Sequence, residues 1–183
     1  MRTRMLAVTL IAAAAVLAAC SNDDGDSSSA DHNDADVTFA QEMIPHHQQA
    51  TEMAALAPSR AESSEVLDLA EQISAAQEPE IATMTSWLES WGEEAPEGMG
   101  SMSDMDSMPG MMSEDEMAEL ENAQGPDFDR LFLTMMIEHH EGAIDMAAAE
   151  QENGENPDAV ALAETIEADQ TAEIATMREL LGS

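Results

Sequence analysis

An internal repeat with an offset of 93 residues constrains the fold of this 183-residue chain more than any other feature. The segment 39–88 aligns without a gap with the segment 132–181, and 22 of the 50 aligned positions are identical. Both copies carry Met-Ile-x-His-His near their start and Glu-Ile-Ala-Thr-Met near their end. Matches spread over this length indicate a duplication, so we expect both copies to fold in the same way.

Each copy has the hydrophobic period of two amphipathic helices joined by a short turn. Apolar residues recur every three or four positions from Phe39 and again from Phe132. Tyrosine is absent and Ala, Leu, Ile and Met dominate the apolar residues, which favours helices over sheets. The sequence therefore predicts an all-α protein, a four-helix bundle built from two duplicated helical hairpins, 36–91 and 127–182, within one domain that spans 36–183.

Residues that commonly cap helices stand where these four helices should begin. They are Asp36, Ser63, Asp127 or Asp129, and Asn156 before Pro157. The first helix of each hairpin should end near Ala57 and Asn153. Between the hairpins, residues 92–112 are rich in Gly, Ser, Asp and Met and predict a Met-rich loop, and a capping box that starts at Ser113 predicts a short helix over 113–124.

The N-terminus has the pattern of a bacterial lipoprotein signal. Two arginines precede an apolar run, and Leu17-Ala-Ala-Cys20 places small residues just before a cysteine. We expect residues 1–19 to be removed, Cys20 to carry the lipid, and 20–35 to form a flexible tether. The alternative is an uncleaved anchor helix, for which the apolar run is short. This predicts an exported protein that is lipid-anchored to the outer face of the cell membrane.

The charge of the chain excludes several classes of partner. The formal net charge is −34, lysine is absent, and only three arginines lie beyond the predicted signal. Such a surface repels nucleic acid and anionic lipid, so we expect no nucleic-acid partner and contact with the membrane only through the lipid on Cys20. A protein partner is not identified by the sequence.

The paired histidines of the repeat lie on or beside the apolar stripe of the first helix in each hairpin. His46 and His139 fall on the stripe, and His47 and His140 fall at its edge. Four polar residues of the second helices share the core-facing side with the apolar residues: Gln77, Glu80, Gln170 and Glu173. Pairing the helices antiparallel puts Gln77 level with His46 and Glu80 level with Met43, to within about a turn.

Buried polar groups need partners, and two interpretations satisfy these. One is a hydrogen-bonded core layer in which Glu holds His. The other is a metal site with His and Met as ligands and the Gln and Glu side chains holding those ligands from behind. Both interpretations stay open on spacing alone.

The residues near the histidines indicate which metal such a site would hold. Carboxylate-bridged di-iron bundles use Glu-x-x-His, whereas Met43 and Met136 precede His46 and His139 by three positions here. A thioether beside an imidazole selects Cu(I) over iron or magnesium. The loop adds a series of methionines among Gly, Ser, Asp and Pro: Met99, Met102, Met105, Met108, Met111 and Met112. These could bind Cu(I) or Ag(I), or else cover the bundle as an adaptable apolar surface.

The two His-His segments resemble the CopM-like family, also known as domain of unknown function 305. The resemblance rests on Met43-Ile-Pro-His-His-Gln-Gln-Ala and on Met136-Ile-Glu-His-His-Glu-Gly-Ala and covers about 36–181. It implies a ferritin-like four-helix fold and a role in extracytoplasmic copper binding and resistance.

Residues and resemblance together predict a non-enzymatic copper-binding lipoprotein that sequesters or hands on Cu(I). A ferritin-like metal oxidase is a weaker alternative, because the Glu-x-x-His spacing is missing. A third alternative is an acidic structural or interaction module whose polar layers only fix the register of the bundle.

Overall fold

The computed structural model describes residues 32–96 and 108–182, and within these residues all regular structure is helical. The helices are α1 (Asp34–Arg60), α2 (Ser64–Trp91), α4 (Glu114–Asn122), α5 (Pro126–Asn153) and α6 (Pro157–Gly182). The all-helical fold predicted from the duplicated hairpins is confirmed. The predicted signal, Cys20, most of the tether and Met99, Met102 and Met105 lie outside the described residues.

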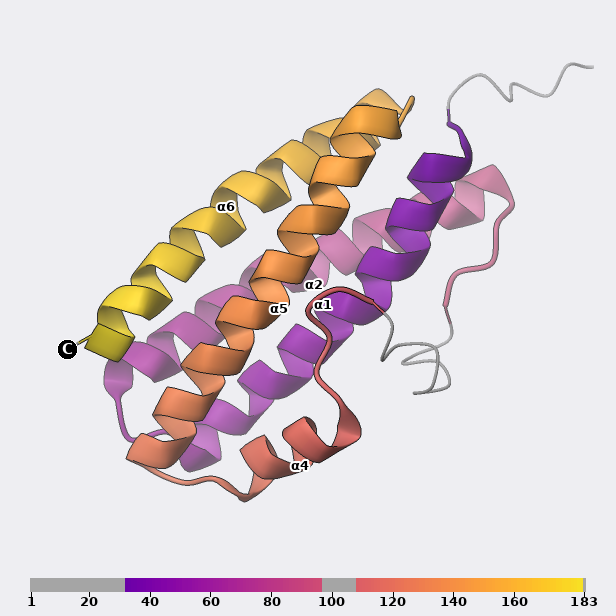
Figure 1. Ribbon diagram of the computed structural model, residues 1–183. Coiled ribbons are helices and arrows are strands. Elements are labelled where there is room, and N and C mark those ends of the chain that lie inside the picture. Colours follow the sequence, from indigo (N-terminus) through magenta and orange to yellow (C-terminus); the bar gives the residue numbers. More distant parts are fainter. Residues whose placement is uncertain (1–31, 97–107, 183) are drawn as a thin grey trace, which may run out of the picture.

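Two antiparallel hairpins, α1–α2 and α5–α6, form the bundle (Figure 1). The hairpins meet where α1 packs against α5, and the short α4 lies across one end of this pair. No helix in the described part of the chain is long and apolar enough to cross a membrane.

The observed helix ends confirm some expected caps and correct others. The side chain of Ser63 caps α2, and the capping box at Ser113 starts α4. Asp36 is not the N-cap as predicted, because α1 begins at Asp34 and its N-cap is Asn33; Asp36 instead closes the capping box by accepting from the backbone N–H of Asn33. The prediction that Asp127 or Asp129 caps α5 is also wrong, since its N-cap is Gly125, which makes no side-chain capping bond.

Two other predicted bounds shift in the structure. Helix α1 continues to Arg60, about one turn beyond the expected end near Ala57. Helix α4 ends at Asn122, two residues before the predicted end.

Asp36 and Asp129 tie each hairpin to the turn of the other. The carboxylate of Asp36 accepts hydrogen bonds from the backbone N–H groups of Glu155 and Asn156 at 3.2 and 2.9 Å. Asp129, its equivalent in the repeat, accepts from the backbone N–H groups of Glu62 and Ser63 at 3.1 and 2.8 Å. These reciprocal contacts join the start of α1 to the turn after α5, and the start of α5 to the turn after α1. Helices α1 and α5 therefore run antiparallel, and the two copies of the repeat are related by an approximate twofold axis.

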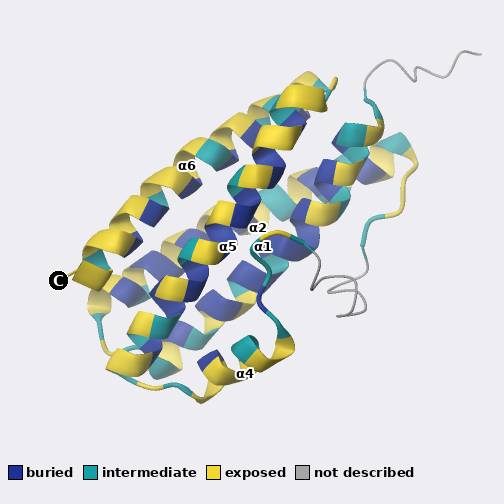
Figure 2. Cartoon of the chain, viewed as in Figure 1, coloured by how far each residue is buried: buried dark blue, intermediate teal, exposed yellow. Residues whose placement is uncertain are grey.

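The apolar core is divided into two clusters, one toward each end of the bundle. The larger one includes Met53, Phe128 and Phe132, and the other includes Phe39 and Met84. Figure 2 shows the buried residues as a stripe along the inner side of each long helix. On each of the four long helices, polar residues separate the residues of one apolar cluster from those of the other. These polar residues include all four paired histidines.

A buried acid, Glu150, lies against Asp36 at the α5–α6 turn. Burial and the neighbouring Asp36 carboxyl raise the pKa of Glu150 to about 8. Burial alone would raise the pKa of Asp36 as well, but hydrogen bonds from Asn33, Glu150, Asn156 and Glu155 lower it. Glu150 therefore keeps a proton at neutral pH and can donate it to the Asp36 carboxylate.

We expect Glu150→Gln to stabilise the protein in alkaline solution. The raised pKa means that folded Glu150 holds a proton that unfolded Glu150 has lost, so the native state loses stability as pH rises from about 4.5 to about 8. Glutamine keeps the donor to Asp36 and removes this titration. The free energy of unfolding from urea titrations should rise by about 1–3 kcal/mol at pH 9 and change little at pH 5. Equal changes at both pH values, or the same gain from the exposed Glu152→Gln, would contradict this.

Candidate metal centre

A polar layer crosses the middle of the bundle, and we call it the histidine layer. Its members are His46, His47, His139, His140, Gln77, Glu80, Gln170 and Glu173. All four imidazoles and both glutamines are buried, while the two glutamates reach partly to solvent. The histidines predicted to turn inward therefore do so, including the two expected only at the stripe's edge.

His46 and His139 meet at the contact between α1 and α5. Their ring centroids are 3.8 Å apart and the ring planes are tilted by 41°. The two residues are equivalent in the repeat, so their contact lies at the approximate twofold axis. The repeat gives each hairpin its own Met-x-x-His-His motif. The structure places one ligand candidate from each hairpin in a single centre.

A segment from Met108 to Met112, which we call the strap, covers this pair. Figure 1 shows it running from the middle of α1 and α5 down to α4. The carbonyl oxygen of Pro109 lies 3.1 Å from Nε2 of His46. A carbonyl only accepts, so Nε2 carries the proton and the lone pair of His46 is on Nδ1.

Two residues hold the strap in place, one on each central helix. The buried side chain of Gln49 donates to the carbonyl of Met112 and accepts from its N–H, both at 2.8 Å. On α5, Gly142 lets the strap backbone come close, since a Cβ added there would stand 2.7 Å from the nitrogen of Gly110. Gln49 and Gly142 are equivalent positions of the repeat, so the copies differ where they meet the strap.

We expect Gly142→Ala to destabilise the protein by about 1–3 kcal/mol, although alanine normally stabilises a helix interior by about 1 kcal/mol relative to glycine. The new methyl group would overlap Pro109 and Gly110 and push the strap away from His46. Thermal and urea unfolding measure the effect. The control is Gly182→Ala, where an added Cβ has no neighbour within 4 Å. A Gly142→Ala protein as stable as the control would show that the strap does not need this close approach.

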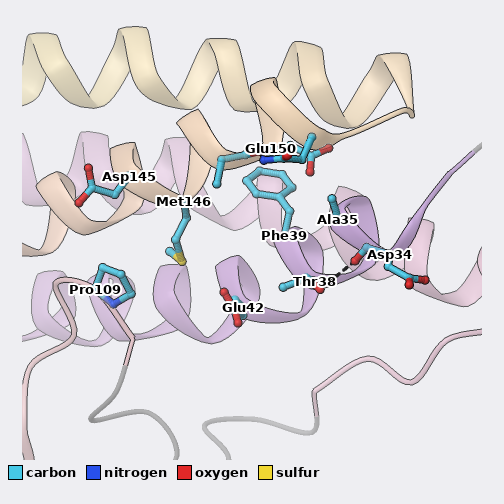
Figure 3. A pocket seen from close by; sticks show the side chains of 11 residues that line it. Asp34, Ala35, Thr38, Phe39, Glu42, Pro109, Asp145, Met146 and Glu150 are labelled. Atoms are coloured by element: carbon cyan, nitrogen blue, oxygen red, sulfur yellow. Dashed lines mark hydrogen bonds between the residues drawn. The ribbon is translucent and has the colours of Figure 1, made fainter.

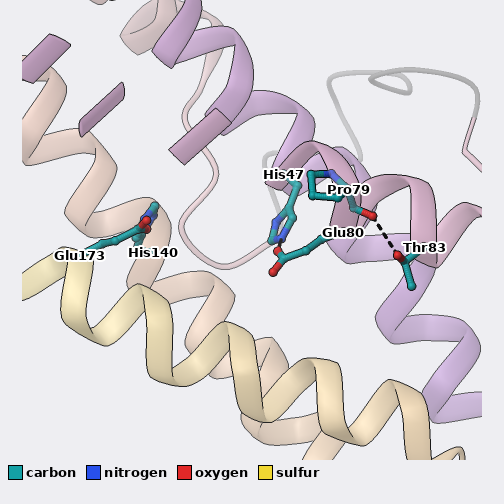
Figure 4. A network of polar contacts seen from close by, with 6 residues as sticks. All are labelled: His47, Pro79, Glu80, Thr83, His140 and Glu173. Carbon is teal, nitrogen blue, oxygen red and sulfur yellow. Dashed lines mark hydrogen bonds and ion pairs between the residues drawn. The ribbon is translucent and has the colours of Figure 1, made fainter. Parts of the chain in front are cut away.

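The second histidine of each pair binds a glutamate of its own hairpin. Nε2 of His47 lies 2.7 Å from Glu80, and Nε2 of His140 lies 2.6 Å from Glu173 (Figure 4). Glu80 was expected level with Met43, and it contacts His47, about one turn further along α1. The carboxylates accept from Nε2, and both Nδ1 atoms lie inside the bundle.

Several polar atoms of the histidine layer have no hydrogen-bond partner among the described residues. They are Nδ1 of all four histidines, Nε2 of His139, both amide atoms of Gln77 and the amide oxygen of Gln170. The expected pairing of Gln77 with His46 is therefore not formed. Each such buried atom costs about 1–3 kcal/mol when it stays unpaired. His139 is the extreme case, because neither of its ring nitrogens is satisfied.

Burial keeps the central imidazoles neutral. Burial, with the neighbouring His47, lowers the pKa of His46 to about 3, despite the bond to Pro109. Burial and the other three imidazoles hold the pKa of His139 well below its usual value, although the nearby backbone of His46 acts to raise it. Both rings thus retain a lone pair at neutral pH, which is the form that binds metals.

The candidate methionines occupy different environments. Met43 and Met136 are fully buried, one turn before His46 and His139 on the same helix faces. Met112 joins the larger apolar cluster, which favours a packing role for its side chain, while Met108 and Met111 are half-buried.

Within the described residues, no group of three or more His, Cys, Asp or Glu side chains converges in a way that could hold a metal ion. A metal at the His46–His139 pair would therefore need ligands of another kind, and thioethers are the soft groups nearest in sequence.

The model of the family "Domain of unknown function (DUF305)" matches residues 36–181. The chain belongs to the DUF305 family. The resemblance noted in the sequence is thereby confirmed, and the match spans both hairpins.

Solved structures of DUF305 proteins share the fold. A DUF305 protein of Streptomyces coelicolor is 34% identical, with a TM-score of 0.74 over 81% of this chain and 92% of that one. CopM in the Cu(II)-bound form is 35% identical, with a TM-score of 0.69 over 80% of this chain and 95% of CopM. CopM in the Cu(I)-bound form is 34% identical, with a TM-score of 0.67 over 79% and 94%. The comparison with curated proteins finds no match.

A groove of about 480 Å³ lies beside the strap in this DUF305 chain (Figure 3). The start of α1 and the end of α5 form its walls, with Phe39 and Met146 on the apolar side and Glu42 and Asp145 among the acids. Pro109 closes one end of the groove and also contacts His46. The strap therefore lies between the groove and the centre.

Sequence reasoning missed the residues that hold the strap. Gly142 offered a signal, because a glycine inside a helix weakens it and often marks a close approach of backbone. Gln49 offered none beyond its difference from Gly142 in the repeat. The Pro109 carbonyl is a backbone group, which no side-chain pattern identifies.

Proposed function

We propose that this DUF305 protein binds Cu(I) at the His46–His139 pair, with Met43 and Met136 completing the ligand set. It acts as an exported lipoprotein that sequesters the ion or hands it on, without turnover. The observation that carries the proposal is the fully buried imidazole of His139, which makes no well-formed hydrogen bond at either nitrogen within the described residues and whose ring centroid lies 3.8 Å from that of His46.

An unsatisfied buried imidazole is unfavourable unless a ligand occupies its lone pair. Three of the four histidines have their Nε2 atoms bound to oxygen acceptors, Pro109, Glu80 and Glu173, and this selects the tautomer with a free Nδ1. Such hydrogen bonds orient imidazole ligands and make them better electron donors. The hydrogen-bonded alternative accounts for His47 and His140, but it leaves His139 unexplained.

Copper(I) is the ion that these residues favour. The only cysteine of the chain is the predicted lipidation site Cys20, so soft ligands in the domain are thioethers and imidazoles. A carboxylate-rich iron site has no support in the described residues, which weakens the oxidase alternative. Structures of the related CopM with Cu(I), with Cu(II) and with silver support copper as the metal, while the thioethers of this chain favour its Cu(I) form.

The lipoprotein signal and the loop methionines complete the proposal. Export and lipid attachment at Cys20 would hold the domain outside the cell membrane. Met108 and Met111 of the strap, with Met99, Met102 and Met105 earlier in the sequence, would offer further thioethers.

Anaerobic Cu(I) titration of the mature domain against a chelating competitor tests the proposal. We expect at least one Cu(I) to be retained against the competitor, with a rise in melting temperature that grows with free Cu(I). Complete loss of Cu(I) to the competitor together with an unchanged melting temperature would leave only the structural interpretation. Oxygen consumption on adding Cu(I) or Fe(II) would instead indicate an oxidase.

A further inference from the structure

The strap is the one support of the centre that the duplication does not supply twice. His47 and His140 each have a glutamate from their own hairpin, at 2.7 and 2.6 Å. His46 has the carbonyl of Pro109, and its equivalent His139 has no hydrogen-bond partner among the described residues. The strap thus breaks the symmetry of the repeat at the His46–His139 pair.

We propose that Gln49 is a positioning residue for His46, acting through the strap. Its two hydrogen bonds to Met112 fix the strap so that the Pro109 carbonyl accepts the Nε2 proton of His46 and leaves only Nδ1 to face a metal. The inference deepens the proposed copper function, and only its copper-binding consequence rests on that function.

The bonds of Gln49 are placed to control the position of Pro109. They are buried, they pair with both polar groups of the Met112 backbone, and Met112 lies three residues after Pro109. The other anchor, Gly142, contributes close packing but no hydrogen bond of its own to the strap, because glycine has no side chain. Packing tolerates small sliding movements that a paired amide does not.

A small displacement of the strap is enough to release His46. The Nε2–oxygen distance is 3.1 Å, and a hydrogen bond is lost beyond about 3.5 Å. Once the carbonyl moves away, the proton of His46 can occupy either ring nitrogen. The tautomer with a free Nδ1, which would bind the metal, then shares the population with the tautomer that has its proton on Nδ1. The neighbouring His47 is unaffected, because Glu80 belongs to α2 and not to the strap.

The test is ¹⁵N NMR of the histidine rings in the metal-free mature domain. The wild type should show His46 with its proton on Nε2. In Gln49→Leu we expect a mixture of the two tautomers at His46, while His47 keeps its Nε2 proton and serves as an internal control. The exposed Gln72→Leu should change neither ring. A single Nε2–H form of His46 in Gln49→Leu, as in the wild type, would overturn the inference.

A second variant protects the test against misfolding. Gln49→Asn keeps both amide groups but is one methylene too short to reach Met112, so it should give the same mixture at His46 with less disturbance of packing. If Gln49→Leu does not fold, the result with Gln49→Asn decides.

A copper measurement separates this inference from the proposed function. Cu(I) affinity should fall about 10-fold in Gln49→Leu, in the range expected for a residue that orients a ligand. An unchanged affinity beside an altered tautomer would overturn the copper-binding consequence of this positioning. A wild-type domain that binds no Cu(I) would refute the proposed function, and the tautomer of His46 would still decide what Gln49 does.

Discussion

The double substitution His46→Gln/His139→Gln is expected to lower the Cu(I) affinity of the mature domain by more than about 100-fold. A residue that only orients a metal ligand commonly contributes 10- to 100-fold to affinity, so the loss of two ligands should exceed that range. Glutamine is close to histidine in size and keeps a polar side chain, which limits damage to packing. Competition with a chelator of known affinity measures the change.

The matched control for this substitution is His32→Gln. His32 stacks on Trp91 at 4.5 Å and lies at the start of α1, outside the histidine layer. Its loss should leave Cu(I) affinity unchanged. An affinity of the double variant within about threefold of the wild type would place the copper ligands elsewhere, with the loop methionines as the first candidates.

The same double substitution should make the domain more resistant to acid. Burial lowers the pKa of His46 to about 3 and holds that of His139 well below its usual value, so both rings stay neutral in the folded state. In the unfolded chain they bind protons below about pH 6.5. The unfolded state then holds more protons than the folded state. The contribution of the two neutral imidazoles to the free energy of unfolding is therefore fully present above pH 6.5 and is lost as the pH decreases toward 3.

The expected size of this acid effect is about 1 kcal/mol per pH unit for each of the two histidines below pH 6.5. Urea unfolding at pH 7, 5.5 and 4.5 would measure it. The many carboxylates titrate in both proteins, so the difference between wild type and variant isolates the imidazoles. Parallel stability curves for the two proteins would mean that the rings are not buried in neutral form.

The helices could be predicted from the sequence because their determinants are local. The apolar period, the duplication and the caps at Ser63 and Ser113 fixed four long helices and one short one. The caps expected at Asp36 and Asp129 failed for a reason that is not local. Each aspartate bonds the backbone of the opposite hairpin's turn, and Asp36 also closes the capping box of its own helix behind Asn33; a sequence pattern does not distinguish these roles from that of an N-cap.

The candidate centre was predictable only in part. Helical spacing placed the histidines inside and brought Glu80 near them, because both depend on geometry within one hairpin. The contact of His46 with His139 depends on how two hairpins cross, which no periodicity encodes. The strap adds a backbone acceptor, Pro109, from a loop whose course is set by distant contacts at Gln49 and Gly142.

The account as a whole depends on a copper ion bound between the two copies of the repeat. Because Cu(I) is diamagnetic, ¹⁵N NMR of the histidine rings after addition of one equivalent identifies the ligands residue by residue. We expect the Nδ1 resonance of His46 and one ring nitrogen of His139 to shift together in a single bound species. Unchanged ring nitrogens of both histidines, in a sample that has retained the equivalent of Cu(I), would contradict the proposed centre.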